Sequence, residues 1–72
     1  MYLSKGEYSQ FSLKGRIHLL QEFGMLVSEK LIDEVRIKIY SLYGFYVEVV
    51  YKENYIIKAE PVLNTGLLEH YL

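Results

Sequence analysis

Residues 35 to 60 contain three consecutive runs in which apolar and polar side chains alternate. The alternating apolar positions are Val35, Ile37 and Ile39, then Phe45, Val47, Val49 and Tyr51, then Tyr55, Ile57 and Ala59. A period of two among β-branched and aromatic residues is typical of half-buried antiparallel strands. The chain is therefore expected to contain a meander of adjacent strands with one apolar face.

The length of each connecting turn decides which side chains share a face. A two-residue turn ending at Gly44 would set Lys38 opposite Val49 and put the charged side of one strand on the apolar side of its neighbour. A slip of one residue reverses the faces. We therefore predict a three-residue loop over 42–44, with Gly44 in the left-handed conformation that glycine tolerates.

The second turn follows the same logic, with a loop over 52–54 that ends in a left-handed Asn54. Opposite charges across neighbouring strands contribute roughly 0.2–1 kcal/mol per pair. The predicted register gathers one such row, an ion-pair ladder of Lys38, Glu48 and Lys58.

A helix is predicted before the meander, over residues 13–23. Ser12 is a suitable N-cap, Gly24 a suitable helix-ending residue, and one side of the segment is apolar. Arg16 falls inside the apolar arc. It either covers the core with its stem while its head reaches water, or aims its guanidinium at an anion. Gly15 costs the helix up to about 1 kcal/mol against alanine, which suggests close contact with another backbone.

The remaining segments are less sharply patterned. Residues 1–11 are expected to form a flexible or loosely docked lead-in. Residues 25–34 match both a strand and helical spacing, and we favour a first strand that turns at 33–34. Pro61 ends the last strand because it has no N–H for the ladder. Residues 66–71 are expected to form a short C-terminal helix.

Together these elements predict a single α+β domain over residues 1–72. One helix is expected to pack on an antiparallel meander of three or four strands, because the helix has one apolar face to bury and the sheet has one to cover. A chain of 72 residues is near the size at which one core is marginal. Self-association is the expected additional stabiliser.

The composition excludes several kinds of site and protein. The sequence has no cysteine, which rules out disulfides and thiolate metal sites and favours a reducing compartment. It has no signal-peptide core and no apolar run near the roughly 20 residues of a membrane span. We expect a soluble, cytoplasmic protein without a membrane partner. Net charge is −1, whereas nucleic-acid binders usually show a basic excess.

Catalytic candidates are few. His18 and His70 are the only histidines, and both are expected at the surface. The spacing of His, Asp and Glu matches no metal site, and the five glycines are too far apart for a phosphate loop. We therefore expect no cofactor, no metal and no catalytic residue, and the chain is not expected to be an enzyme.

The outer face of the predicted sheet is too apolar to face water alone. An apolar patch bordered by charge is typical of a partner site or dimer interface. The predicted contact residues are Arg36, Lys38, Tyr40, Tyr46, Val50 and Ile56. The chain is thus expected to be a non-catalytic interaction module that forms a homo-oligomer or binds a protein partner, through this face or an edge strand.

The alternative function is nucleic-acid binding or a small toxin-like ribonuclease. Sheet tyrosines can stack on single-stranded bases. The residues that would serve are Arg36, Lys38, Tyr40, Tyr46 and Lys58. The net charge and the acidic Glu48 within the supposed RNA face oppose this alternative.

Residues 39–51, with Ser12-Leu13-Lys14 and Arg16 before them, resemble a group of short, uncharacterised bacterial proteins. The shared features are a helix, a Leu-Tyr…Gly-Phe-Tyr-Val-Glu-Val meander and a short helical tail. Ile39 stands where the group is expected to have leucine. The resemblance would cover residues 11–72 and implies a stand-alone bacterial domain, but it transfers no functional residue.

Overall fold

The computed structural model describes residues 2–62 and folds them into two helices and one antiparallel sheet of four strands. The elements are α1 (Lys5–Ser9), α2 (Leu13–Phe23), β1 (Met25–Ile32), β2 (Val35–Leu42), β3 (Phe45–Lys52) and β4 (Tyr55–Pro61). The strands lie side by side in chain order, so the predicted α+β meander is confirmed. The helix predicted over 66–71 lies outside the described residues.

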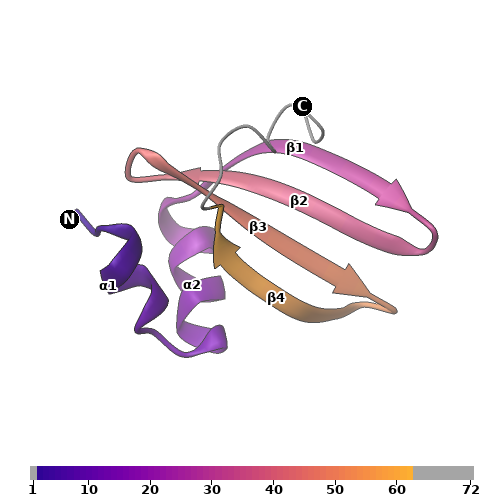
Figure 1. The fold of residues 1–72 in the computed structure, drawn as a ribbon, viewed down its shortest axis with the longest axis horizontal. Helices are drawn as coiled ribbons and strands as arrows, with labels where there is room; N and C mark the ends of the chain where they lie inside the picture. Colours follow the sequence, from indigo (N-terminus) through magenta and orange to yellow (C-terminus); the bar gives the residue numbers. More distant parts are fainter. Residues whose placement is uncertain (1, 63–72) are drawn as a thin grey trace.

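Both helices lie at one end of the sheet, near the turn between β2 and β3 (Figure 1). The other end, with the β1–β2 and β3–β4 turns, extends beyond them (Figure 1). One sheet face therefore has a helix-covered half and a half without helices. We call this sheet face the helix face, and we call the half of it that carries no helix the helix-free half.

The core lies between the helices and the covered half of the helix face. Its buried residues are Leu3, Tyr8, Leu19, Leu20, Leu42, Phe45, Val47, Val49 and Ala59. The ring of Tyr8 meets that of Phe45 edge to face, with centroids 5.8 Å apart. Aromatic contact and aliphatic burial together fix both helices on the sheet.

All three hairpins close through two residues rather than three. The turn residues are Asp33 and Glu34, Tyr43 and Gly44, and Glu53 and Asn54, and all have positive φ between 48° and 85°. Two consecutive left-handed residues are typical of type I′ turns, whose twist matches that of the flanking strands. The predicted three-residue loops are therefore wrong, although Gly44 and Asn54 have the predicted left-handed conformation.

The shorter turn reverses the faces of β2 relative to the prediction. Lys38 pairs with Val49 and Tyr40 with Val47, which places both on the helix face. Ile37 and Ile39 point to the opposite face, where Ile39 is fully buried. The register is acceptable because Lys38 lies in the helix-free half, where its charge is not forced into the core.

Tyr43 occupies a left-handed position that a bulky residue normally avoids. Its ring lies 5.9 Å from that of Phe23, at the end of α2, and 6.3 Å from that of Tyr2. These aromatic contacts offset backbone strain and attach the β2–β3 turn to the helices.

Helix α1 replaces the expected lead-in over residues 1–11. Ser4 and Glu7 form a capping box. The Ser4 side chain accepts from the Glu7 N–H at 3.2 Å, and the Glu7 carboxylate accepts from the Ser4 N–H at 3.1 Å. The Ser-x-x-Glu spacing was a readable signal for a helix start. Leu3 and Tyr8 then bury the segment in the core.

Two segments follow the prediction closely. Helix α2 spans Leu13–Phe23 between the expected caps, Ser12 and Gly24, and residues 25–32 form a strand rather than a helix. Arg16 has a role that neither interpretation included. Its guanidinium donates to the Phe11 carbonyl at 3.1 Å and to the Ala59 carbonyl at 3.0 Å, which ties α2 to β4.

Candidate interaction surface

The outer edge of β4 is closed to further strands. Val62 donates to the Tyr46 carbonyl at 2.9 Å, and hydrogen-bonded pairs alternate in an antiparallel ladder, so Ala59 and Pro61 direct their backbone groups outward. The Ala59 carbonyl is taken by Arg16, and Pro61 has no N–H. A register shift between Val50 and Tyr51 further disrupts the pairing of this strand. Prolines, irregularities and covering helices are the usual means of blocking an edge.

Among residues 2–62, no strand lies along the outer edge of β1, although a register shift between Leu26 and Ser28 interrupts the regular ladder of this strand. Ile32 and Val35 flank a two-residue turn, so they form the hydrogen-bonded pair that closes the hairpin. By alternation, Glu29 and Leu31 direct their N–H and C=O groups away from β2. Within residues 2–62, β1 has a neighbouring strand on one side only. Its outer side therefore presents a row of backbone groups suited to strand addition.

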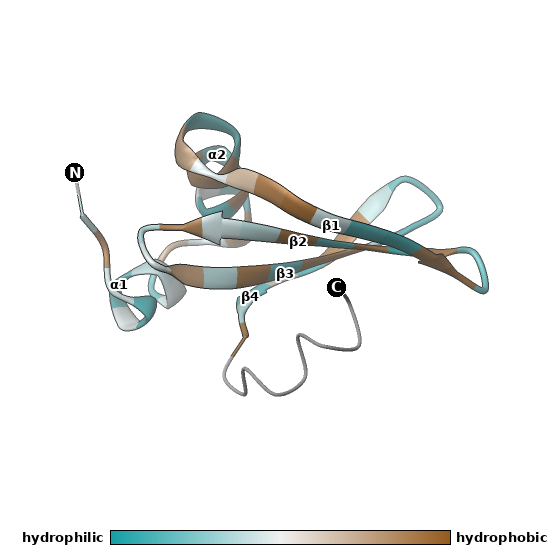
Figure 2. Ribbon diagram, turned by 90° about the horizontal axis from the view of Figure 1, so that it is seen from above, coloured by the Kyte–Doolittle hydropathy of each residue, from teal (hydrophilic) through white to brown (hydrophobic). Residues whose placement is uncertain are grey.

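Exposed apolar side chains concentrate along this edge. Of the eleven exposed large hydrophobic residues in the described part of the chain, six lie between positions 23 and 32. Five of these six lie on β1, namely Met25, Leu26, Val27, Leu31 and Ile32, with Met25 70 % and Leu31 68 % exposed, whereas Phe23 ends α2. Figure 2 shows hydrophobic bands at both ends of β1 and a hydrophilic segment between them. A long apolar edge of this kind marks a contact surface.

An ion cluster borders the β1 edge on the helix-free half. The Glu29 carboxylate lies 3.6 Å from Lys38 Nζ and 3.9 Å from Arg36 Nε. Lys38 Nζ also lies 5.1 Å from the centroid of the Tyr51 ring, a cation–π contact. Burial, followed by the neighbouring Tyr51 hydroxyl, raises the pKa of Tyr40. Two further acids, Glu34 and Glu53, line the same hollow as Arg36 and Lys38, so the cluster has no positive excess.

The six predicted contact residues do not share one face. Arg36, Lys38, Tyr40 and Ile56 are on the helix face, whereas Tyr46 and Val50 are on the opposite face. Tyr40 and Ile56 also pack against the core. The reversed faces of β2 move Arg36, Lys38 and Tyr40, and the two-residue turn before β4 moves Ile56, which pairs with Tyr51. Of the six, Arg36 and Lys38 alone belong to the ion cluster.

The predicted ladder of Lys38, Glu48 and Lys58 is partly correct. Lys58 Nζ lies 2.7 Å from a Glu48 carboxylate oxygen on the opposite face. The Glu48 side chain is only 13 % exposed, so this is a sheltered structural ion pair. Lys38 lies on the other side of the sheet with Glu29 instead. The change of register between β2 and β3 therefore separates Lys38 from the other two residues of the predicted ladder.

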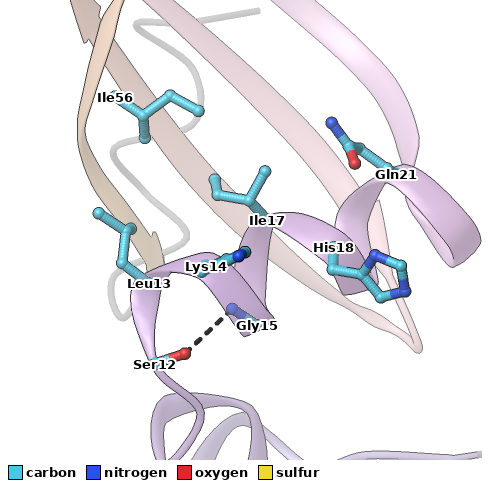
Figure 3. A pocket seen from close by; sticks show the side chains of 8 residues that line it. All are labelled: Ser12, Leu13, Lys14, Gly15, Ile17, His18, Gln21 and Ile56. Carbon is cyan, nitrogen blue, oxygen red and sulfur yellow. Dashed lines mark hydrogen bonds between the residues drawn. The ribbon is translucent and has the colours of Figure 1, made fainter.

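An open apolar groove of about 700 Å³ lies between α2 and β4. Figure 3 shows Leu13 and Ile17 pointing toward the same space as Ile56, with His18 and Gln21 at the rim. His18 is exposed and lies 3.9 Å from Glu22. A Cβ added at Gly15 would meet side-chain atoms of Phe11 and Ser12, not the backbone of another segment that the sequence suggested.

The described residues contain no group of three or more His, Asp or Glu side chains placed to hold a metal ion. His70 lies outside the described residues. No helix within residues 2–62 is long and apolar enough to cross a membrane.

Comparison with models of known protein families, with curated proteins and with solved structures finds no match to this chain. The resemblance to short bacterial proteins stays a prediction.

Proposed function

We propose that this chain is a small, non-catalytic protein–protein interaction module that self-associates. The observation that supports the proposal is the concentration of exposed apolar side chains along the open β1 edge of the sheet. Covering this edge would remove apolar surface from water, which is the main favourable term in association. A domain of this size also gains stability from a second copy.

Nucleic-acid binding is the second candidate. Arg36, Lys38 and Tyr51 lie together on the helix-free half. There the two basic side chains could contact a phosphate, and the Tyr51 ring could stack on a nucleobase. Glu29 lies between the two bases and reduces their attraction for phosphate. Tyr46 and Lys58, which this function was expected to use, lie on the opposite face.

The deciding experiment is solution mass by light scattering during size exclusion, over a range of concentrations, with and without a short mixed-sequence RNA. A mass that rises with concentration from 8.5 kDa toward twice that value, and ignores RNA, supports self-association. A constant monomer mass overturns it. A monomer that gains mass only with RNA favours the second candidate.

A matched pair of variants locates the contact. Leu31→Lys adds a charge to the open edge, and Ile57→Lys adds the same charge to an exposed apolar position on β4. Self-association is expected to weaken in the first variant and to persist in the second. Equal weakening in both would show that the contact is not at the β1 edge.

A further inference from the structure

We infer that the sheet face opposite the helix face is the docking surface for the chain's own C-terminal segment, residues 63–72. The inference goes beyond the proposed self-association and does not depend on it. It rests on the burial of Ile39 and Glu48, on the point at which the described chain leaves the sheet, and on the apolar pattern of the residues that follow.

Ile39 is completely buried although it lies on the opposite face. The buried residues of both helices belong to the core cluster, and Ile39 is not a member of that cluster. Figure 2 shows α2 on one side of the sheet. Side chains stand roughly perpendicular to a sheet, so strand neighbours shield their flanks but not their tips. Complete burial of Ile39 therefore requires a cover on the side away from α2, and neither helix within residues 2–62 supplies it.

Glu48 is the cross-strand partner of Ile39 and is sheltered as well. Its side chain is 13 % exposed, and its carboxylate lies 2.7 Å from Lys58 Nζ. A sheet face that meets water normally carries polar side chains. The residues that share this face with Ile39 instead include Ile37, Tyr46 and Val50. The composition of the face therefore favours a cover over direct contact with water.

The described chain leaves the sheet beside this face. Val62 donates a hydrogen bond of 2.9 Å to the Tyr46 carbonyl, and residues 63–72 of the sequence follow directly. Tyr46 lies two positions from Glu48 on β3, a distance of roughly 7 Å along the strand. A segment of this length spans up to about 33 Å when extended and about 15 Å as a helix. It can therefore reach Ile39 in either conformation.

The segment carries the apolar side chains that a cover needs. Its apolar residues are Leu63, Leu67, Leu68, Tyr71 and Leu72. At helical spacing, positions 67, 68, 71 and 72 fall on one stripe. Burying this stripe against Ile39 and its neighbours would remove apolar surface of both partners from water. One chain therefore contains both the face and a suitable cover.

A second copy is the competing occupant of this face. Ile39, however, has no exposed surface in the single chain, before any partner is added. The charges also suit the segment, whose acidic residue is Glu69. The charged residues of the face are Lys30, Lys52, Lys58, Glu48 and Glu60, a slight basic excess. Docking within one chain would also keep Tyr46 and Val50, two of the predicted contact residues, from an external protein.

Single cysteines measure the cover, because the chain has no cysteine of its own. Ile39→Cys places a thiol on the opposite face and Val49→Cys places one on the helix face, at positions that are 0 % and 1 % exposed. Both thiols should react slowly with a water-soluble thiol reagent in the 72-residue chain. Shortening the chain to end at Val62 should speed the reaction of Ile39→Cys at least about tenfold and leave that of Val49→Cys within about twofold.

A matched pair of substitutions tests the same contact in the 72-residue chain. Leu68→Asp puts a charge on the apolar stripe, and His70→Asp puts the same charge on the other side of the segment. In a chain that also carries Ile39→Cys, the first should speed the thiol reaction at least about tenfold, and the second should leave it unchanged. Equal effects of the two substitutions overturn docking through the stripe.

Circular dichroism establishes that each variant is folded before its thiol is measured. Slow reaction of Ile39→Cys in a folded chain that ends at Val62 overturns the inference, because the cover would then lie elsewhere. Equal acceleration of Ile39→Cys and Val49→Cys, by shortening and by Leu68→Asp alike, overturns it too. The segment would then support the whole fold rather than this face.

Dilution distinguishes the segment from a second copy. Protection of Ile39→Cys that does not depend on protein concentration supports docking within one chain. Protection that falls on dilution assigns the cover to a second copy and overturns the inference, while the proposed self-association stands. A chain that is monomeric at every concentration and still protects Ile39→Cys overturns the proposed function alone.

Discussion

Arg16 Nη1 donates a hydrogen bond of 3.0 Å to the carbonyl oxygen of Ala59, across 43 positions of sequence. The same guanidinium donates to Phe11, and the Arg16 carbonyl accepts a long hydrogen bond of 3.4 Å from the Tyr8 hydroxyl. One residue thus connects α1, α2 and β4. It also occupies an outward carbonyl on the β4 edge, so one contact both holds the helices and closes that edge.

Arg16→Met is expected to lower the free energy of unfolding by about 1–3 kcal/mol, because the stem remains while two carbonyls lose a charged donor. Urea denaturation measures this loss. Lys14→Met removes a neighbouring exposed base and should change stability by no more than about 0.5 kcal/mol. Equal effects of the two substitutions would show that the Arg16 hydrogen bonds contribute nothing.

Tyr8 should make the fold sensitive to alkaline pH. Burial raises the pKa of Tyr8 to about 12, and the nearby Arg16 lowers it only in part. In the unfolded chain the hydroxyl titrates near its ordinary value of about 10. Between these values the unfolded state loses a proton that the folded state keeps, so stability that is fully present below a pH of about 10 is lost as pH rises toward about 12.

The Tyr8→Phe variant should lack this loss, which for wild type is on the order of 2–3 kcal/mol. Unfolding curves at several pH values between about 9 and 12 compare the two chains. Tyr55→Phe, at an exposed position, should follow wild type. Parallel decline of wild type and Tyr8→Phe would refute the assignment to Tyr8.

Two glycines at α2 should respond in opposite directions to alanine. A Cβ on Gly15 would meet side-chain atoms of Phe11 and Ser12 at 3.4 Å, nearly ordinary contact, and the helix would gain up to about 1 kcal/mol. A Cβ on Gly24 would lie 2.7 Å from the Leu20 carbonyl oxygen, so Gly24→Ala should destabilise. Thermal unfolding should show a raised midpoint for the first variant and a lowered one for the second. A common sign would contradict the contacts.

A glycine at position 34 should make the β1–β2 turn more stable. Glu34 has φ of 70°, a conformation that costs an L-residue about 1–2 kcal/mol, and Asp-Gly is a preferred type I′ pair. Glu34→Gly should therefore stabilise the fold by up to about 1 kcal/mol, measured by urea denaturation. Glu22→Gly, the same substitution within α2, should destabilise by a similar amount. Destabilisation by both would argue against the positive φ at Glu34.

Local signals in the sequence determined the secondary structure. Ser12 and Gly24 bound α2 because capping depends on a few neighbouring residues, and alternation identified β2, β3 and β4 because a strand shows its two faces within its own length. The capping box of Ser4 and Glu7 was equally local and was missed. It stands in a short segment whose burial depends on Tyr8 reaching Phe45 across the fold.

Only the tertiary structure decided which faces meet. Two-residue and three-residue turns differ by one position, and that single step moves Lys38 and Tyr40 to the helix face. The sequence pattern alone favoured a uniformly apolar face, whereas the short helices cover one half of the sheet and leave room for charge on the other (Figure 1). The open edge of β1 likewise depends on strand order, and the closed edge of β4 on the Arg16 contact.

The amino-acid sequence by itself determined the helix α2, the strands and their alternation, because these are short-range properties. Register, faces and edges were settled by contacts between residues far apart in the chain.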